Sequence, residues 1–302
     1  MKKQKYLVLI VGPTAVGKTD LCLSLAKKLD AEIFSCDSRQ FYKEISIGTA
    51  KPTAEELAQV PHHFINNLHI DQNYTVADFE KEVLEKLDAY FIEKDVAIMT
   101  GGSGLFAKAI THGFDNIPDT PTSLRDELKE RLETEGLENL VTELRNLDPT
   151  YCLQADLSNA QRVIRALEVS KFTGKPFSSW QVQKKQTRPF GIIKIALELP
   201  REELYNRINH RVDLMLNAGL LEEVKSVSQH SDKNALQTVG YKEVFDFLNG
   251  NTDKETMIEL IKRNTRRYAK RQMTWFRNQD TFKWFSPMDP KSIIQYIMAE
   301  IK

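Results

Sequence analysis

The sequence is poor in cysteine and contains no long apolar run. Its three cysteines, Cys22, Cys36 and Cys152, are far apart and form no Cys-x-x-Cys pair, which argues against a disulfide framework and against a zinc site. No apolar run approaches the roughly 18 residues that a membrane span needs, and residues 1–3 precede a predicted strand rather than the apolar stretch of a signal peptide. We therefore expect a soluble protein of the reducing cytoplasm that does not enter a membrane.

The sequence also lacks an excess of charge of either sign. Its 42 basic and 42 acidic side chains cancel, so binding to a nucleic acid has to come from local clusters of positive charge. No internal repeat or low-complexity tract is present. A chain of 302 residues can form one large core, two smaller cores, or one domain with an insertion.

A phosphate-binding loop stands out near the start of the chain. It follows the apolar run at residues 6–11, which predicts a buried strand, and it leads into a helical apolar pattern. Glycine turns N–H groups inward, the helix N-terminus favours an anion, the lysine adds a charge and the last hydroxyl can hold magnesium. The alternative is a glycine turn without a ligand. The motif reads Gly12-Pro13-Thr14-Ala15-Val16-Gly17-Lys18-Thr19.

Strands and helices alternate after this loop, which predicts a parallel sheet. Residues 31–37 read as a second strand that ends in Asp37, and residues 96–100 read as a third strand after a helix at residues 76–92. The glycine-rich run at residues 101–104 follows the third strand, where its N–H groups and the Ser103 hydroxyl can face the same ligand, although a purely structural turn is an alternative. Paired histidines at residues 62–63 are expected in a loop and are assigned no metal.

The strand signal disappears between residues 118 and 189, where three helices are predicted at residues 122–135, 137–147 and 159–173. The latter part of this insertion has one acid, Glu168, and interleaves Phe177 and Trp180 with basic side chains. These are Arg162, Arg165, Lys171, Lys175, Lys184, Lys185 and Arg188. Such a composition is typical of a nucleic-acid-binding surface, and the alternative is the solvated face of an ordinary helix.

A strand at residues 191–199 and helices at residues 204–216 and 256–278 follow the insertion. Arg207 and Arg211 are four residues apart, a spacing that can reach a polyphosphate, although such arginines are as often surface charges. The last long helix has seven basic side chains and no acid between Leu260 and Gln279. A helix of this charge should repel itself unless an anion lies across it, which favours a phosphate backbone as partner.

The position of the acid weakens the first hypothesis for the phosphate loop, an ATP-binding or other nucleotide-binding enzyme. Kinases and nucleotide hydrolases usually place a magnesium-organising acid at the end of an apolar strand. The third strand ends in Thr100 instead, and the candidate acid is Asp37. That carboxylate could help to organise magnesium or could accept a proton from a nucleophile.

Several motifs together resemble the tRNA dimethylallyltransferase family, also called tRNA isopentenyltransferases. The resemblance runs almost from end to end of the chain. Besides the phosphate loop, it is carried by Asp37-Ser38, Ile47-Gly48-Thr49-Ala50-Lys51-Pro52, Gly101-Gly102-Ser103, Asn159-Ala160-Gln161-Arg162-Val163-Ile164-Arg165-Ala166-Leu167-Glu168, Val239-Gly240-Tyr241-Lys242-Glu243 and Ala269-Lys270-Arg271-Gln272-Met273-Thr274-Trp275-Phe276-Arg277.

The resemblance implies transfer of the dimethylallyl group of dimethylallyl diphosphate to N6 of the adenosine directly 3′ of the anticodon in tRNA, with release of pyrophosphate. In that family the phosphate loop holds the diphosphate of the donor, so ATP is not the substrate. Loop amides, Lys18 and Mg²⁺ at Thr19 would neutralise charge on the leaving pyrophosphate. Asp37 would accept the proton of the exocyclic amine, and the base would have to leave its stack to meet the donor.

The resemblance also assigns residues to the reacting atoms and to the tRNA. Asp37, Ser103 and Arg125 are expected at the reacting end. The expected tRNA contacts are Asp37, Ser38, Arg39, Gln40, Ser103, Arg125, Gln161, Arg162, Val163, Ile164 and Arg165. Position 103 is often threonine in relatives, and serine keeps the hydroxyl. Arg207 and Arg211 are added here as clamps on the diphosphate.

The expected fold is α/β, with a P-loop kinase-like parallel sheet flanked by helices and an all-helical insertion domain. We expect the core at residues 1–117 and 190–302, including the basic helix near the C-terminus, and the insertion for the anticodon stem-loop at residues 118–189. The protein is expected to be a monomer. Three alternatives stay open: an ATP-dependent small-molecule kinase, an adenylate isopentenyltransferase that modifies a free nucleotide, and an RNA-binding module with a vestigial phosphate loop.

Overall fold

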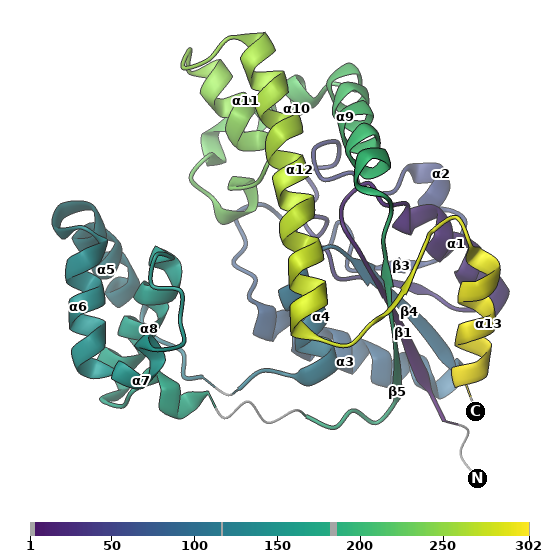
Figure 1. The fold of residues 1–302 in the computed structure, drawn as a ribbon, viewed down its shortest axis with the longest axis horizontal. Coiled ribbons are helices and arrows are strands. Elements are labelled where there is room, and N and C mark those ends of the chain that lie inside the picture. Colours follow the sequence, from purple (N-terminus) through teal and green to yellow (C-terminus); the bar gives the residue numbers. More distant parts are fainter. Residues whose placement is uncertain (1–3, 116, 182–185, 302) are drawn as a thin grey trace. The chain divides into compact units, whose positions relative to one another are not determined.

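The chain folds into two compact units, of which the larger contains a parallel sheet (Figure 1). The computed structural model describes residues 4–115, 117–181 and 186–301. The larger unit is formed by Met1–Thr111 together with Thr187–Lys302, and the smaller unit by His112–Gln186. The smaller unit is therefore an insertion in the sequence of the larger one.

Six strands form the sheet within the described residues. They are β1 Tyr6–Val11, β2 Ile33–Ser35, β3 His62–His63, β4 Val96–Gly101, β5 Gly191–Leu197 and β6 Lys283–Phe285, in the spatial order β3-β2-β4-β1-β5-β6. All neighbouring strands pair in parallel, with β1 between β4 and β5. Parallel pairing needs crossover connections, and helices supply most of them.

Both faces of the sheet are buried under helices, which explains why β1 is apolar throughout. Leu7 and Leu9 enter one core and Val8 and Ile10 enter the other, as the alternation of a strand requires. The first core includes residues of α3 Val76–Glu93 and α4 Gly104–His112, and the second includes residues of α1 Lys18–Leu29 and α13 Pro290–Glu300. The result is a three-layer α/β unit, and the predicted fold class is confirmed.

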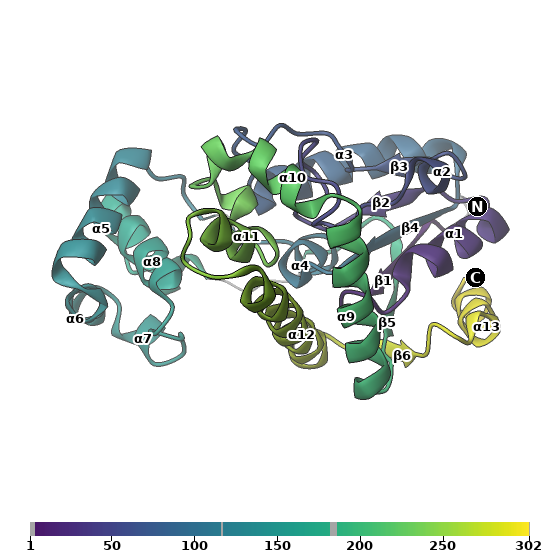
Figure 2. The same ribbon diagram turned by 90° about the horizontal axis from the view of Figure 1, so that it is seen from above.

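Further helices of the larger unit gather where the carboxyl ends of β1 and β2 lie. They are α2 Ala54–Leu57, α9 Arg201–Asn217, α10 Leu220–Ser226, α11 Tyr241–Leu248 and α12 Lys254–Gln279. Among them, α12 packs against both α9 and α11, and Figure 2 shows α9 and α12 as long neighbouring rods. Within the described residues, no helix is both long enough and apolar enough to cross a bilayer.

The smaller unit is helical and has its own core. It contains α5 Thr122–Glu135, α6 Leu137–Leu147, α7 Pro149–Cys152 and α8 Ala160–Thr173. Leu128, Leu140, Leu144 and Leu167 are fully buried in this core. Gly136 separates α5 from α6 with a φ of 83°, a conformation that favours glycine.

The structure corrects the sequence-based elements in a few places. His62–His63 was expected in a loop but forms the edge strand β3, because it pairs with Ile33 and Phe34 of β2. β2 is shorter than predicted and ends at Ser35, so Asp37 lies two residues beyond it. The helices α4, α10 and α11 were not predicted at all.

Candidate functional site

The phosphate loop lies between the end of β1 and the start of α1 and has the conformation that the motif predicts. Gly12 and Gly17 have φ values of 155° and 103°, and Ala15 also has a positive φ of 65°. A Cβ on Gly12 would lie 2.9 Å from the carbonyl oxygen of Leu197, so a side chain does not fit there. This backbone turns a series of N–H groups toward the N-terminus of α1, where an anion is favoured.

Lys18 points back onto its own loop. Its Nζ donates hydrogen bonds to the carbonyl oxygens of Gly12 at 3.0 Å and Pro13 at 2.8 Å. Burial lowers the pKa of Lys18 to about 8; the charge of Asp37 opposes this shift and that of Arg211 adds to it. An anion in the loop would therefore meet a lysine whose charge is poorly compensated by the protein.

Two arginines of α9 approach the phosphate loop from the other side. A Cβ on Gly17 would lie 3.4 Å from Nη2 of Arg207, which places this guanidinium against the loop. Burial lowers the pKa of Arg211, and the neighbouring charge of Arg207 lowers it further. Together with Lys18, these side chains bring three positive charges toward one cavity, where an anion would stabilise them.

The acidic tip beyond β2 is linked to the loop that follows β4. The Oδ1 atom of Asp37 accepts a hydrogen bond from the backbone N–H of Arg39 at 3.1 Å. The hydroxyl of Ser103 lies 3.1 Å from the backbone nitrogen of Ser38 and 3.1 Å from its hydroxyl oxygen. Asp37, Ser38 and Ser103, which the sequence assigned to the same site, are thus brought together.

The glycines at residues 101–104 allow close packing. A Cβ on Gly101 would lie 2.8 Å from the backbone nitrogen of Asp37, and a Cβ on Gly102 would lie 2.3 Å from Nε2 of Gln272. A Cβ on Gly104 would lie 2.1 Å from the ring of Trp275. Gly102 also lines the cavity, so this run combines a packing role with a place at the site.

The loop at residues 46–52 forms another wall and is held by a single carboxylate. Glu223 accepts hydrogen bonds from the backbone N–H groups of Ser46, Ile47 and Gly48 at 2.7, 2.7 and 2.9 Å, and from the Tyr241 hydroxyl at 2.6 Å. Burial, followed by the charge of Glu223, raises the pKa of Tyr241, so its hydroxyl stays a donor.

Gln40, which follows β2 in the sequence, also holds the loop at residues 46–52. Its Nε2 donates to the carbonyl oxygens of Thr49 at 3.3 Å and Ala50 at 3.2 Å, and its Oε1 accepts from the Ser35 hydroxyl. The Gln40 side chain, assigned to tRNA from the sequence, is thus committed to internal bonds although it lines the cavity.

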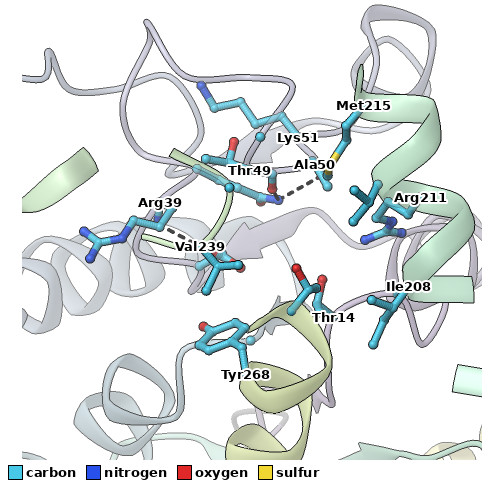
Figure 3. Close-up of a pocket in the computed structure, with 18 of the residues that line it drawn as sticks. Thr14, Arg39, Thr49, Ala50, Lys51, Ile208, Arg211, Met215, Val239 and Tyr268 are labelled. Atoms are coloured by element: carbon cyan, nitrogen blue, oxygen red, sulfur yellow. Dashed lines mark hydrogen bonds between the residues drawn. The ribbon is translucent and has the colours of Figure 1, made fainter. Parts of the chain in front are cut away.

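These elements enclose a cavity of about 330 Å³. Figure 3 shows Ile208, Arg211 and Met215 entering from α9, Tyr268 entering from α12, and the loop with Thr49 and Ala50 opposite them. Its lining contains the charged side chains of Lys18, Asp37 and Arg211 and also several apolar side chains. The apolar side chains are Ala50, Ile208, Val212, Met215, Leu220, Val239 and Ile261. A molecule that carries both a polyanion and a small apolar group fits this lining.

The donor set of the cavity suits magnesium better than a transition metal. Among the described residues, no group of three or more His, Cys, Asp or Glu side chains could hold a metal ion. The Thr19 hydroxyl and the Asp37 carboxylate both line the cavity. Magnesium usually takes few protein oxygens and completes its shell with water and phosphate oxygens, so these residues fit it.

In the smaller unit, one buried acid holds Arg125, which was expected at the reacting end, and Arg165, which was expected to contact tRNA. Glu168 is fully buried and accepts hydrogen bonds from Arg125 at 2.8 and 2.6 Å and from Arg165. Burial alone would raise the pKa of Glu168, but hydrogen bonds from these arginines hold it below its ordinary value. Both guanidiniums keep an exposed edge, since 46% of the Arg125 side chain and 32% of the Arg165 side chain are accessible.

Not all of the predicted tRNA contacts in the smaller unit are exposed. Gln161 and Arg162 are exposed at the N-terminus of α8, where Asn159 caps the helix. Val163 and Ile164, however, are buried in the core of the unit. Because these two side chains pack inside the unit, we restrict the hypothesis of direct tRNA contact to the polar residues Gln161, Arg162 and Arg165.

The basic, aromatic segment that follows α8 is also more internal than its composition suggests. Phe177 is a buried core residue, so its ring is not presented for stacking on bases, and Trp180 is half-buried against the same core. Arg188 is buried and pairs with Glu80 at 2.5 Å in the larger unit. Lys184 and Lys185 lie outside the described residues.

The charge of α12 is partly neutralised by the protein itself, which corrects the expectation that an external anion is needed. Lys262 pairs with Asp213 at 2.8 Å and Arg277 pairs with Glu198 at 2.9 Å. Arg263, Arg267 and Lys270 are exposed and occur at spacings of four and three. These three residues form a stripe on the solvent side of the helix, called the basic stripe below.

Some site residues escaped sequence reasoning. Gln272 and Tyr268 line the cavity from α12, and Lys51 lines it from the opposite loop. Gln272 and Lys51 stood inside motifs that resemble the family, but neither had an assigned role. Glu223, which holds the loop at residues 46–52, carried no local signal, because the backbone N–H groups that it binds in this loop are 175 to 177 positions away.

Comparison with known proteins gives consistent matches over the whole chain. The matching family model is described as IPP transferase and covers residues 40–279. The tRNA dimethylallyltransferase of Cytophaga hutchinsonii is 48% identical over 298 residues, which are 99% of this chain and 98% of that protein. The tRNA dimethylallyltransferase of Christiangramia forsetii is 50% identical over 297 residues, or 98% of each protein.

Solved structures give the same result. A full-length tRNA isopentenylpyrophosphate transferase from Bacillus halodurans superposes with a TM-score of 0.73 and 38% identity, covering 99% of this chain and 97% of that chain. A eukaryotic dimethylallyltransferase acting on tRNA superposes with a TM-score of 0.74 and 30% identity, covering 90% of this chain and 70% of that chain. The suspected family resemblance is confirmed.

Proposed function

Since the chain belongs to the IPP transferase family, whose members similar to it are named tRNA dimethylallyltransferases, we propose the following reaction. The protein transfers the dimethylallyl group of dimethylallyl diphosphate to N6 of the adenosine 3′-adjacent to the anticodon of tRNA and releases pyrophosphate. The relatives favour this reaction over a small-molecule kinase and over transfer to a free adenylate. The observation that supports it best is that Lys18 and Asp37 line one cavity.

The donor binds with its diphosphate in the phosphate loop. Lys18, Arg207 and Arg211 line this cavity with positive charge, and N–H groups of the loop other than that of Thr14, which is bonded to Gln272, would add partial charge. They would neutralise the charge that grows on pyrophosphate as the bond to the allylic carbon breaks. Residues such as Val212 and Met215 would receive the five-carbon group.

The Thr19 hydroxyl, which lines the cavity, would hold magnesium as its protein ligand. When bound, the ion supplies further charge neutralisation to the leaving group.

The acceptor amine meets Asp37. Adenine N6 is a weak nucleophile, because its lone pair is delocalised into the ring, and loss of its proton during attack raises its reactivity. The Asp37 carboxylate has one oxygen engaged by Arg39 N–H, which leaves the other able to accept that proton. Ser103 orients the same loop through Ser38.

The tRNA is bound by residues of both units. In the smaller unit we assign contacts to Gln161, Arg162 and the exposed edges of Arg125 and Arg165, which are polar and accessible. In the larger unit we assign contacts to Ser38, Arg39 and the basic stripe. Positive side chains suit the phosphate backbone of a stem-loop.

The choice of acceptor tests the proposal. The protein is incubated with labelled dimethylallyl diphosphate and magnesium, in parallel with unmodified tRNA, with AMP, and with ATP plus AMP. Label is expected in tRNA alone, with one pyrophosphate released for each group transferred. Labelling of AMP, or consumption of ATP without labelling of tRNA, would reject the proposed function.

A further inference from the structure

One buried amide joins the phosphate loop to the loop that carries Ser103. Gln272 of α12 is only 6% exposed. Its Oε1 accepts a hydrogen bond from the backbone N–H of Thr14 at 2.9 Å, and its Nε2 donates to the carbonyl oxygen of Gly102 at 2.9 Å. A single side chain thus spans the gap between a loop after β1 and a loop after β4.

One of the two loops is assigned to the donor diphosphate, and the other lies beside the residue assigned to the acceptor amine. Thr14 belongs to the loop assigned to the diphosphate, and Gly102 precedes Ser103, whose hydroxyl is bonded to Ser38 beside Asp37. The loops belong to neighbouring strands, but β1 and β4 pair only as far as Val11 and Gly101. Beyond that point the sheet no longer sets their separation, and Gln272 provides a direct link between them.

An uncharged primary amide suits this pair of bonds. The link needs an acceptor for Thr14 N–H and a donor for Gly102 C=O at the end of one side chain, and among the natural side chains with this reach glutamine offers both without charge. If the amide were removed, a backbone donor and a backbone acceptor would lose their partners in a buried place, which is costly. The bonds therefore hold both loops in one arrangement.

The loop at residues 101–104 packs closely against α12. A Cβ on Gly102 would lie 2.3 Å from Nε2 of Gln272, and a Cβ on Gly104 would lie 2.1 Å from Trp275, one turn further along α12. Tyr268, one turn earlier, lines the cavity. One face of α12, formed by Tyr268, Gln272 and Trp275, therefore lies directly against the site.

We propose that Gln272 is a positioning residue that sets the distance between the phosphate loop and the loop at residues 101–104, which carries Ser103. This inference rests on the proposed function of the same cavity. Transfer requires the nucleophile in line with the leaving group, and an error of about 1 Å in such an alignment can cost about 100-fold in rate. Gln272 acts through the two loops rather than on the reacting atoms.

The test compares Gln272→Ala and Gln272→Glu with Gln279→Ala, which removes an exposed glutamine from the end of the same helix. In single-turnover transfer with saturating donor and tRNA, Gln272→Ala should be about 10- to 100-fold slower. The dissociation constants of donor and tRNA should change by no more than about threefold, because no charge to either substrate is lost. Gln279→Ala should behave as the wild type.

A second measurement needs no substrate and separates this inference from the proposed function. Amide exchange of Thr14 should be faster in Gln272→Ala than in the wild type and unchanged in Gln272→Glu, whose carboxylate still accepts from Thr14 N–H. The glutamate cannot donate to Gly102, so its transfer rate should still fall. A general loss of stability in Gln272→Glu would not lower the transfer rate while leaving the amide exchange of Thr14 unchanged.

Two results would overturn the inference. One is wild-type transfer by Gln272→Ala, and the other is a loss of rate that appears only with an equal loss of substrate affinity and no change in Thr14 exchange. If the wild type itself transferred nothing to tRNA, the proposed function would fall, while the exchange measurement would still decide whether Gln272 holds the phosphate loop.

Discussion

The hydroxyl of Ser103 lies 3.1 Å from the backbone nitrogen of Ser38, although these residues are 65 positions apart. This bond ties the loop after β4 to the acidic tip after β2, next to Asp37. It gives position 103 a role that needs a hydroxyl and little else. Serine and threonine can both fill that role, whereas alanine cannot.

Ser103→Ala is expected to slow transfer by about five- to tenfold, since one hydrogen bond to a backbone N–H is worth about 1 kcal/mol. Ser103→Thr should keep at least half of the activity. The measurement is the transfer rate under saturating tRNA and donor. Equal rates for the alanine and threonine variants would remove the hydroxyl from the account.

Asp37→Asn is expected to lower transfer by more than about 100-fold, because an amide cannot take the proton of the amine. Affinity for tRNA should stay within about threefold, measured by filter binding. The matched control is Asp88→Asn, which alters an exposed acid on α3. An Asp37→Asn variant that keeps most of its rate would exclude Asp37 as the base.

Donor binding should weaken as the pH rises above 8. The pKa of Lys18 is lowered to about 8 in the protein without ligand, so the side chain becomes neutral above that pH. A bound diphosphate favours the charged form and raises the pKa again, and binding between pH 8 and 9 should take up about 0.5 to 0.9 proton. Calorimetry in buffers of different ionisation enthalpy measures this uptake. A constant affinity from pH 7 to 9.5 without proton uptake would contradict it.

Glu168→Ala should destabilise the smaller unit by about 2 to 4 kcal/mol. Removing a buried partner leaves the charges of Arg125 and Arg165 uncompensated, and the partial exposure of these arginines reduces the cost below that of a fully buried pair. Thermal unfolding measures the change. Glu135→Ala is the control, because its pair with Arg131 is at the surface, and it should cost much less. Equal effects would contradict this.

Neutralising the basic stripe should weaken tRNA binding in a salt-dependent way. In the variant Arg263→Gln, Arg267→Gln, Lys270→Gln, the slope of log affinity against log salt should fall by about 2 to 3. Donor affinity should not change. Arg277→Gln, which removes an arginine paired with Glu198, should change the slope much less. An unaltered slope in the triple variant would exclude the stripe from the tRNA surface.

The sequence predicted those parts of the fold that depend on local pattern. The apolar run at residues 6–11, the glycine positions of the phosphate loop, and the spacing of apolar residues at 76–92 each indicated their element. One element was missed because it needs a distant partner, since β3 forms only because β2 lies beside it. The helices α4 and α11 were missed because they are too short for a clear helical period.

The same distinction holds for the site. Lys18, Thr19 and Asp37 were predicted because a motif or its place after a strand indicates their chemistry. The bonds of Gln272 to Thr14 and Gly102 join residues 258 and 170 positions apart, and no local pattern predicts them. Composition misled at Phe177 and Arg188, because it does not distinguish a side chain in a core or a buried ion pair from one at the surface.

The central claim is that the phosphate loop holds the leaving group and that the acceptor is an adenosine of tRNA. Its most direct test is to incubate the protein with labelled dimethylallyl diphosphate, magnesium and unmodified tRNA, digest the RNA and identify the labelled nucleoside and its position by mass spectrometry. Label is expected on N6 of the adenosine 3′-adjacent to the anticodon, and this labelling should depend on Lys18 and Asp37. Label at another position, or the same labelling in Asp37→Asn, would contradict it.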